Sequence, residues 1–308
     1  MAATLERGSK VIVMVLILIS LPVLLAGVEA VSYILHNRNN ASIVSSGEDR
    51  EYLLYVPKSY DPAKPAPLVI SLHGGAVWPA AQRDMSRWNT AADHHGIIVA
   101  YPMGRGITPA WQMRIRDPEM PRDVRFIADL IDTVAAAYNI DPRRIYADGL
   151  SNGAGMAFVL SCALSDRIAA VGMVSSALLI PFEACSNDHP VPLIAFHGTH
   201  DPVAPYDGGT SWVKPGTFPS VWSFVADWGR RNRCALNPVE SEIAADVSRR
   251  SYHGCAENAD VVLYTIKGGG HTWPGGGPVP EWFMGPTTHS VNATEEIWAF
   301  FRDHPLRP

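Results

Sequence analysis

The chain has 308 residues, of which 47% are hydrophobic and 18% are charged. These proportions are those of a globular protein with a large core, and they exclude a disordered chain. The formal net charge of −5 gives no basic surface, so we expect no nucleic-acid partner.

The first 30 residues differ from the rest of the chain. An apolar run over residues 11–28 follows Arg7 and Lys10. This run is long for a signal-peptide core and short for a membrane span. Residues 1–30 are therefore predicted to be a signal peptide or an N-terminal membrane anchor, and both alternatives stay open. In either case the basic residues place the remainder outside the cytoplasm, secreted or anchored, with membrane contact only through this segment.

The rest of the chain divides into a short polar part and a long folded part. Residues 31–47 are rich in asparagine and serine, and we expect them to form a polar tether. Residues 48–308 contain no second block of different composition, so they are predicted to form one domain.

Short apolar runs alternate with segments of helical periodicity from residue 51 onward. Strands are predicted over residues 51–56, 67–72, 96–101, 144–147, 169–174, 191–196 and 261–266. Helices are predicted over residues 85–95, 123–138, 154–164, 221–231 and 293–302. This alternation indicates βαβ units, and therefore an α/β protein with a mainly parallel sheet covered by helices on both faces.

A G-x-S-x-G pentapeptide lies between a predicted strand and a predicted helix, at residues 149–153. This context is typical of a nucleophile elbow, in which a strained turn holds a serine hydroxyl at the end of a sheet. Gly149 and Gly153 would let the two elements approach closely. The pentapeptide alone also fits a glycine-rich loop with a helix-capping serine.

Two other loops supply partners for Ser151. Asp201 follows the strand predicted over residues 191–196, and His271 leaves the strand over residues 261–266 through a glycine turn. In open parallel sheets, sites lie beyond the carboxyl ends of the strands. The order Ser151, Asp201, His271 is that of nucleophile, acid and base in α/β-hydrolases. His271 would accept the serine proton, and Asp201 would orient the imidazole.

Neighbouring residues complete the predicted site. The backbone N–H groups of Asn152 and Gly75 are expected to bind the oxyanion. Trp273 is expected to contact the substrate, because it lies two residues after His271. The sequence suggests no metal site and no organic cofactor.

Four cysteines, Cys162, Cys185, Cys234 and Cys255, allow three pairings. No C-x-x-C spacing suggests zinc, so structural disulfides in an oxidising compartment are predicted. The pairing expected from sequence proximity is Cys162 with Cys185 and Cys234 with Cys255.

Several segments together resemble the polyhydroxybutyrate depolymerase and feruloyl–acetylxylan esterase family of α/β-hydrolases. They are PLVISLHGG at residues 67–75, DVRFI at 123–127, DPRRIY at 141–146, GLSNG at 149–153, FHGTHD at 196–201 and GGGHTWP at 268–274. The resemblance runs from about residue 50 to residue 304. It implies an α/β-hydrolase fold and an exported serine esterase with Ser151, Asp201 and His271 as the triad.

The sequence departs from the family pattern in two places. Ala76-Val-Trp78 follows the His-Gly-Gly segment where small or polar residues are usual, and Gly153-Ala-Gly155 replaces the usual Gly-Gly. The first departure bears on the oxyanion loop, and the second on helix packing.

We therefore expect hydrolysis of carboxylic esters through an acyl-serine intermediate. The expected substrates are feruloyl or acetyl esters of plant walls, or polyhydroxyalkanoate, in polymeric or small form. One alternative is a serine peptidase of the prolyl-oligopeptidase kind, which the lack of room for a gating domain disfavours. Another is a catalytically silent binding protein on a hydrolase scaffold, which the complete triad disfavours.

Overall fold

The computed structural model describes residue 32 and residues 35–113, 120–176, 182, 185, 189–211, 217–235 and 237–307. The predicted signal peptide or membrane anchor over residues 1–30 lies outside these residues. Within the described part of the chain, no helix is long and apolar enough to cross a bilayer. The chain divides into two units, Met1–Arg38 and Asn39–Pro308, and the second contains the fold described below.

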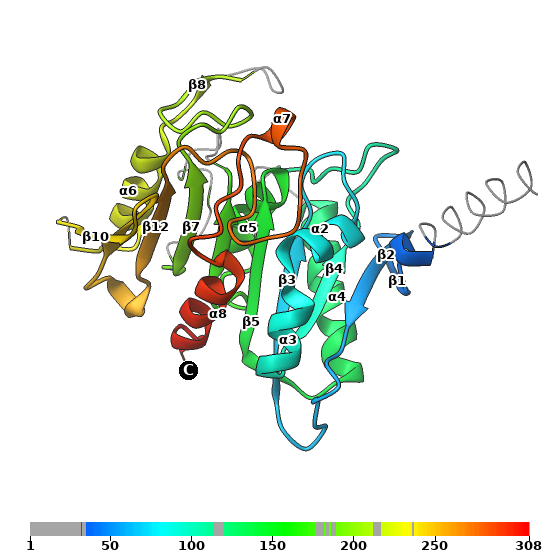
Figure 1. Ribbon diagram of the computed structural model, residues 1–308. Coiled ribbons are helices and arrows are strands. Elements are labelled where there is room, and N and C mark those ends of the chain that lie inside the picture. The colour runs from blue at the N-terminus through cyan, green and yellow to red at the C-terminus, as the bar shows by residue number, and fades with distance from the viewer. Residues whose placement is uncertain are drawn as a thin grey trace, which may run out of the picture. The chain divides into compact units, whose positions relative to one another are not determined.

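A ten-stranded sheet forms the centre of the second unit, counted over the described residues (Figure 1). Its middle strands are parallel and follow one another across the sheet as β4 (Ile98–Pro102), β3 (Ala66–Leu72), β5 (Ile140–Leu150), β6 (Val171–Val174), β7 (Leu193–Gly198) and β12 (Val261–Ile266). Antiparallel strands extend both edges: β2 (Glu48–Tyr55) and β1 (Ala41–Ser45) beside β4, and β11 (Val247–Tyr252) and β10 (Val239–Ala244) beside β12. Strands β8 (Gly209–Thr210) and β9 (Thr217–Phe218) form a separate pair.

Helices cover both faces of the sheet (Figure 1). One face carries α4 (Arg122–Ala137), α5 (Asn152–Ala163) and α6 (Val221–Arg231), and the other carries α2 (Pro79–Ser86), α3 (Trp88–His95) and α8 (Ala293–Asp303). Two short helices, η2 (Ala256–Asn258) and α7 (Glu281–Met284), lie in connections. Alternate residues of the buried strand β3 pack into the two cores, Leu68 and Ile70 on one side and Val69 on the other. This arrangement confirms the α/β-hydrolase fold.

The polar tether predicted over residues 31–47 is wrong at β1. This strand pairs with β2, and its alternate residues Ala41 and Ile43 pack on the core. Just before it, the Asn40 side chain donates to Leu54 O at 2.9 Å and accepts from Leu54 N at 2.8 Å. This segment has many polar residues, and the inward face of its edge strand is only partly apolar. The sequence therefore shows no clear strand pattern here.

The single helix predicted over residues 85–95 is divided at Arg87. This residue has a φ of 57°, in the left-handed region, so α2 ends there and α3 begins after it.

The predicted disulfides are confirmed. Cys162 of α5 pairs with Cys185, and Cys234 pairs with Cys255. Paired cysteines of this kind are typical of proteins in oxidising compartments.

Candidate active site

Ser151 lies in the sharp turn between β5 and α5. Its φ of 55° and ψ of −115° are rare for a residue with a side chain, and its N–H donates to Val174 O at 2.9 Å. Such a conformation persists only where its surroundings fix it. Because β5 and β6 are neighbouring parallel strands, this bond holds the serine at the carboxyl end of the sheet.

Two glycines allow this turn. A Cβ atom on Gly149 would lie 2.5 Å from the carbonyl carbon of Gly153, and a Cβ atom on Gly153 would overlap Leu72 O. Only glycine fits at these two positions, so the strand, the helix and the end of β3 can meet. The close approach predicted from the pentapeptide is present.

Asp201 and His271 are joined by a hydrogen bond. His271 Nδ1 lies 2.8 Å from Asp201 Oδ2. The other carboxylate oxygen, Oδ1, accepts from the N–H groups of Val203 and Ala204, both at 2.8 Å. His197 Nε2 lies 3.3 Å from Oδ2 and also donates to Ala204 O at 2.8 Å.

These contacts set the charge of the pair. Burial by itself raises the pKa of Asp201, but the hydrogen bonds from His197 and His271 outweigh it, so the pKa lies below its ordinary value. An ionised carboxylate only accepts hydrogen bonds, so Nδ1 of His271 carries the shared proton. In the neutral imidazole with this tautomer, the Nε2 atom of His271 has the lone pair that a general base requires.

The elbow after β5 and the histidine loop after β12 are linked through Ser175, which follows β6. Ser175 follows Val174, the acceptor of the Ser151 N–H, and Ser175 Oγ donates to Thr272 O at 3.3 Å. No hydrogen bond joins Ser151 to His271 over the described residues. Bonds of this kind are often long in unliganded enzymes and tighten when substrate binds.

The predicted oxyanion donors lie side by side. A Cβ atom on Gly75 would be 3.7 Å from the Cβ of Asn152, so the two backbones are close. In the described part of the chain, neither of their N–H groups has a protein acceptor, whereas the next N–H, that of Ala76, donates to Pro109 O at 2.8 Å. Their role in binding an oxyanion stays a prediction, supported by this geometry.

Trp273 does not lie at the surface. Its side chain is 1% exposed and packs in the core beneath α3 and α8, where its indole N–H donates to Thr294 Oγ1 at 2.9 Å. The expectation of a direct substrate contact finds no support in this burial. The side chain instead anchors the loop that carries His271.

Sequence reasoning missed two sets of contacts. His197 contacts Asp201, and its spacing of four residues from Asp201 is the one sequence signal for this contact. Trp111 is buried and bonded to Asn152 and His73, on either side of Ser151. No local pattern pointed to those bonds.

Known proteins resemble this chain in sequence and in fold. Residues 50–225 match the profile of the family described as Esterase PHB depolymerase. The chain therefore belongs to that family of α/β-hydrolases.

Individual relatives support the same assignment. The chain is 31% identical to feruloyl esterase B of Piromyces equi, over 72% of this chain but only 42% of that protein. It is 30% identical to the putative esterase NocK of Nocardia uniformis subsp. tsuyamanensis, over 76% of this chain and 73% of that protein. The solved acetyl xylan esterase from Aspergillus awamori shares the fold, with a TM-score of 0.55 and 15% identity over 75% of this chain and 93% of that one.

Proposed function

We propose that the chain is a serine esterase, with Ser151 as nucleophile, His271 as base and Asp201 as the acid that orients it. The observation that carries the proposal is the buried Asp201–His271 pair at the strand ends beside a strained serine elbow. Relatives described as esterases support it.

The reaction follows from these positions. Ser151 Oγ attacks the ester carbonyl while His271 Nε2 takes its proton, and the N–H groups of Gly75 and Asn152 bind the oxyanion. His271 then protonates the leaving alcohol, and an acyl group stays on Ser151. Water, deprotonated by His271, attacks the acyl carbon. The bond from that carbon to Ser151 Oγ then breaks as His271 returns the proton to Oγ, and the carboxylic acid leaves.

The proposed substrates are feruloyl or acetyl esters of plant-wall polysaccharides, or polyhydroxyalkanoate. One relative is described as a feruloyl esterase, and the solved structure that shares the fold is described as an acetyl xylan esterase. The family description names polyhydroxybutyrate depolymerase. A panel of p-nitrophenyl acetate, methyl ferulate, acetylated xylan, polyhydroxybutyrate emulsion and a peptide amide separates these substrates from a peptidase activity.

We also propose that the chain is exported. The two disulfides support an oxidising compartment, and the apolar run over residues 11–28 is the segment that would direct export. The mass of the mature protein distinguishes a cleaved signal peptide from an uncleaved anchor.

Replacement of the nucleophile tests the proposed reaction. We expect Ser151→Ala to lower ester turnover by up to about 10⁶-fold, the loss found when a triad member is removed. A fluorophosphonate probe should label wild-type protein at Ser151 and leave the variant unlabelled. The variant should keep its circular dichroism spectrum and thermal midpoint.

The matched control is Ser161→Ala. Ser161 is a buried serine of the neighbouring helix α5, and its Oγ donates to Phe158 O at 2.8 Å. This variant should lose some stability and keep its turnover. A folded Ser151→Ala protein with turnover near that of Ser161→Ala would refute the proposed nucleophile.

A further inference from the structure

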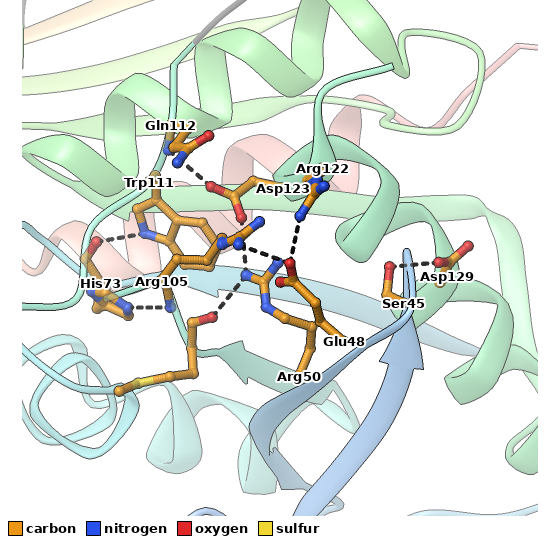
Figure 2. A network of polar contacts seen from close by, with 12 residues as sticks. Ser45, Glu48, Arg50, His73, Arg105, Trp111, Gln112, Arg122, Asp123 and Asp129 are labelled. Carbon is orange, nitrogen blue, oxygen red and sulfur yellow. Dashed lines mark hydrogen bonds and ion pairs between the residues drawn. The ribbon is translucent and has the colours of Figure 1, made fainter. Parts of the chain in front are cut away.

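One buried tryptophan touches both loops that carry the proposed oxyanion donors. Trp111 lies in the segment after β4 and is 3% exposed. Its backbone N–H donates to Asn152 Oδ1 at 2.6 Å, and Asn152 Nδ2 donates back to Trp111 O at 3.3 Å. Its indole N–H donates to His73 O at 2.9 Å (Figure 2).

The two bonding partners of Trp111, Asn152 and His73, lie in the segments that carry the two oxyanion donors. Asn152 is the first residue of α5, so a clamp on its side chain limits rotation of the residue that carries one donor. The carbonyl of His73 begins the short His73–Gly74–Gly75 segment that carries the other donor. Trp111 therefore spans the gap between two donors that come from segments far apart in the sequence.

The His73 side chain makes this arrangement rigid. Its Nε2 accepts the N–H of Gly104 at 2.9 Å, so its proton lies on Nδ1, which donates to Gly74 O at 2.7 Å. Burial lowers the pKa of His73 to about 4, and the ring is neutral at physiological pH, as both bonds require. The ring also packs on the Trp111 indole, with centroids 5.1 Å apart.

A second set of contacts fixes Trp111 from the opposite direction. The N–H of the next residue, Gln112, donates to Asp123 Oδ2 at 2.8 Å, and Asp123 Oδ1 forms a buried ion pair with Arg50 at 2.9 Å (Figure 2). Arg50 also donates to Met103 O at 3.1 Å, at the start of the same segment. The segment that presents Trp111 is thus attached to both β2 and α4.

We propose that Trp111 is a positioning residue that sets the spacing of the Gly75 and Asn152 N–H groups in the oxyanion hole. This inference rests on the proposed esterase function. An oxyanion donor is effective only when it lies within hydrogen-bond distance of the oxygen as charge develops, and small displacements are costly. Trp111 itself does not touch the reacting atoms.

A purely structural role predicts a different result, because a buried tryptophan also contributes to stability. Trp228 of α6 gives a matched control. It is 0% exposed and its indole N–H donates to Val191 O at 2.8 Å. Over the described residues its ring contacts are with Phe158, Phe182 and Phe224, not with Gly75 or Asn152. Both Trp111→Phe and Trp228→Phe remove one buried N–H···O bond.

The test compares kinetics and stability of the two variants on p-nitrophenyl acetate. We expect Trp111→Phe to lower kcat by about 10- to 100-fold with little change in KM, less than the loss of a whole oxyanion donor. Trp228→Phe should shift the thermal midpoint by a similar amount and keep kcat within about twofold of wild type. The inhibition constant of a boronic acid, which forms a tetrahedral adduct, should rise in Trp111→Phe by the factor by which kcat/KM falls.

A second variant, at Asn152, tests the contact between Trp111 and the segment that carries the other oxyanion donor. Asn152→Leu keeps the backbone N–H but removes the side-chain clamp, and Asn152 is only half-buried. If the two side chains act together, the double variant should lose no more than the larger single loss. If Trp111→Phe does not fold, Asn152→Leu alone still tests the contact, because loss of the clamp should lower kcat in this single variant too.

Two results would overturn the inference. One is a kcat of Trp111→Phe equal to that of Trp228→Phe, and the other is full additivity of folded Trp111→Phe and Asn152→Leu. Wild-type protein that cleaves none of the esters would instead contradict the proposed function. The two failures are therefore distinguishable.

Discussion

The two sides of the candidate site are held in place by different kinds of contact. On the oxyanion side, the bonds come mainly from side chains, namely those of His73, Trp111, Asn152 and Asp123. On the base side, the loop after β12 is held mainly by its backbone. The N–H of His271 donates to Met284 O at 2.6 Å, and that of Gly270 donates to Pro286 O at 2.9 Å.

Close packing of glycines explains the base side. A Cβ atom on Gly270 would lie 2.5 Å from the Cα of Gly285, and one on Gly198 would lie 2.6 Å from Gly270 O. The loop therefore fits against β7 and α7 with no room for side chains. Side-chain bonds such as that of Trp273 to Thr294 add to these backbone contacts, but an atom added at these glycines displaces the backbone itself.

The difference predicts how each side responds to substitution. The oxyanion side should lose function in steps, one bond at a time, while the fold persists. The base side should tolerate almost no change at its glycines, because position and stability depend on the same contacts.

The strongest test of this comparison adds one methyl group to each side. Gly270→Ala forces its Cβ into Met284 O and Gly285, so the bond from His271 N–H to Met284 O must break. We expect a loss of about 3 kcal/mol in the free energy of unfolding, at the upper end for overpacking, together with a large fall in kcat. Urea unfolding and ester turnover measure the two effects.

The matched substitution on the oxyanion side is Gly75→Ala. Its Cβ would meet only the Cβ of Asn152, at an ordinary contact distance of 3.7 Å. The free energy of unfolding should change by less than about 1 kcal/mol. Equal destabilisation by Gly270→Ala and Gly75→Ala would show that the two sides do not differ in this way.

The base side was also the more predictable from sequence. Local sequence signals mark the glycine run before His271, the strand over residues 261–266 and the helix over residues 221–231. The structure has both the strand and the helix at these bounds. Continuous apolar runs likewise marked the other parallel strands, because a strand buried on both faces needs apolar residues throughout.

The missed elements lack such signals. Strands β10 and β11 are half-exposed and polar, and are joined by cross-strand contacts such as Arg250 with Glu240 at 2.6 Å. The bonds of Trp111 reach 38 residues to His73 and 41 residues to Asn152, so only the tertiary fold brings them together. For Trp273, proximity to His271 in sequence suggested the site, but its side chain points to Thr294 in the core.

A second prediction concerns the support behind the oxyanion side. Asp123→Asn removes the charge that pairs with buried Arg50, leaving a cation without compensation. Breaking a buried pair in this way costs about 3 kcal/mol or more. Because Asp123 also accepts the N–H beside Trp111, kcat should fall too, with unfolding and turnover measured on the same preparations.

The control uses an exposed pair in α6. Asp227 contacts Arg230 at the surface, where pairs contribute about 0–1 kcal/mol. Asp227→Asn should therefore leave both stability and kcat near wild type. If Asp123→Asn behaved like Asp227→Asn, the network of Figure 2 would not be what holds the oxyanion side.

A further effect is expected between the two sides, on the strand that carries the nucleophile. Asp148 of β5 is fully buried three residues before Ser151, and it accepts the indole N–H of Trp88 at 2.5 Å. Its other oxygen, Oδ1, has no partner in the described part of the chain. Burial raises the pKa of Asp148 to about 7, against the opposing hydrogen bonds from Ser71 and Trp88.

The sign of its pH dependence follows from linkage. Between about pH 4 and pH 7 the folded protein keeps this proton while the unfolded chain has lost it, so the unfolded state binds fewer protons. The free energy of unfolding therefore falls as pH rises through this window and levels off above it. Asp148→Asn does not titrate, so its stability relative to wild type should rise from pH 4 to pH 8, by at most about 4 kcal/mol.

A carboxyl group at the start of the same strand should show the opposite sign. Partial burial raises the pKa of Asp141, but hydrogen bonds from Arg144 and from the N–H of Arg143 outweigh it, so the net shift is downward. Its contribution is present above about pH 4 and is lost as pH falls. Asp141→Asn should thus be less stable than wild type at pH 8 and approach it under acid conditions. Urea unfolding of wild type, Asp148→Asn and Asp141→Asn at several pH values gives the difference in free energy of unfolding between each variant and wild type. The two differences should change with pH in opposite directions. A difference for Asp148→Asn that does not change with pH would mean that this buried carboxyl group is ionised at neutral pH.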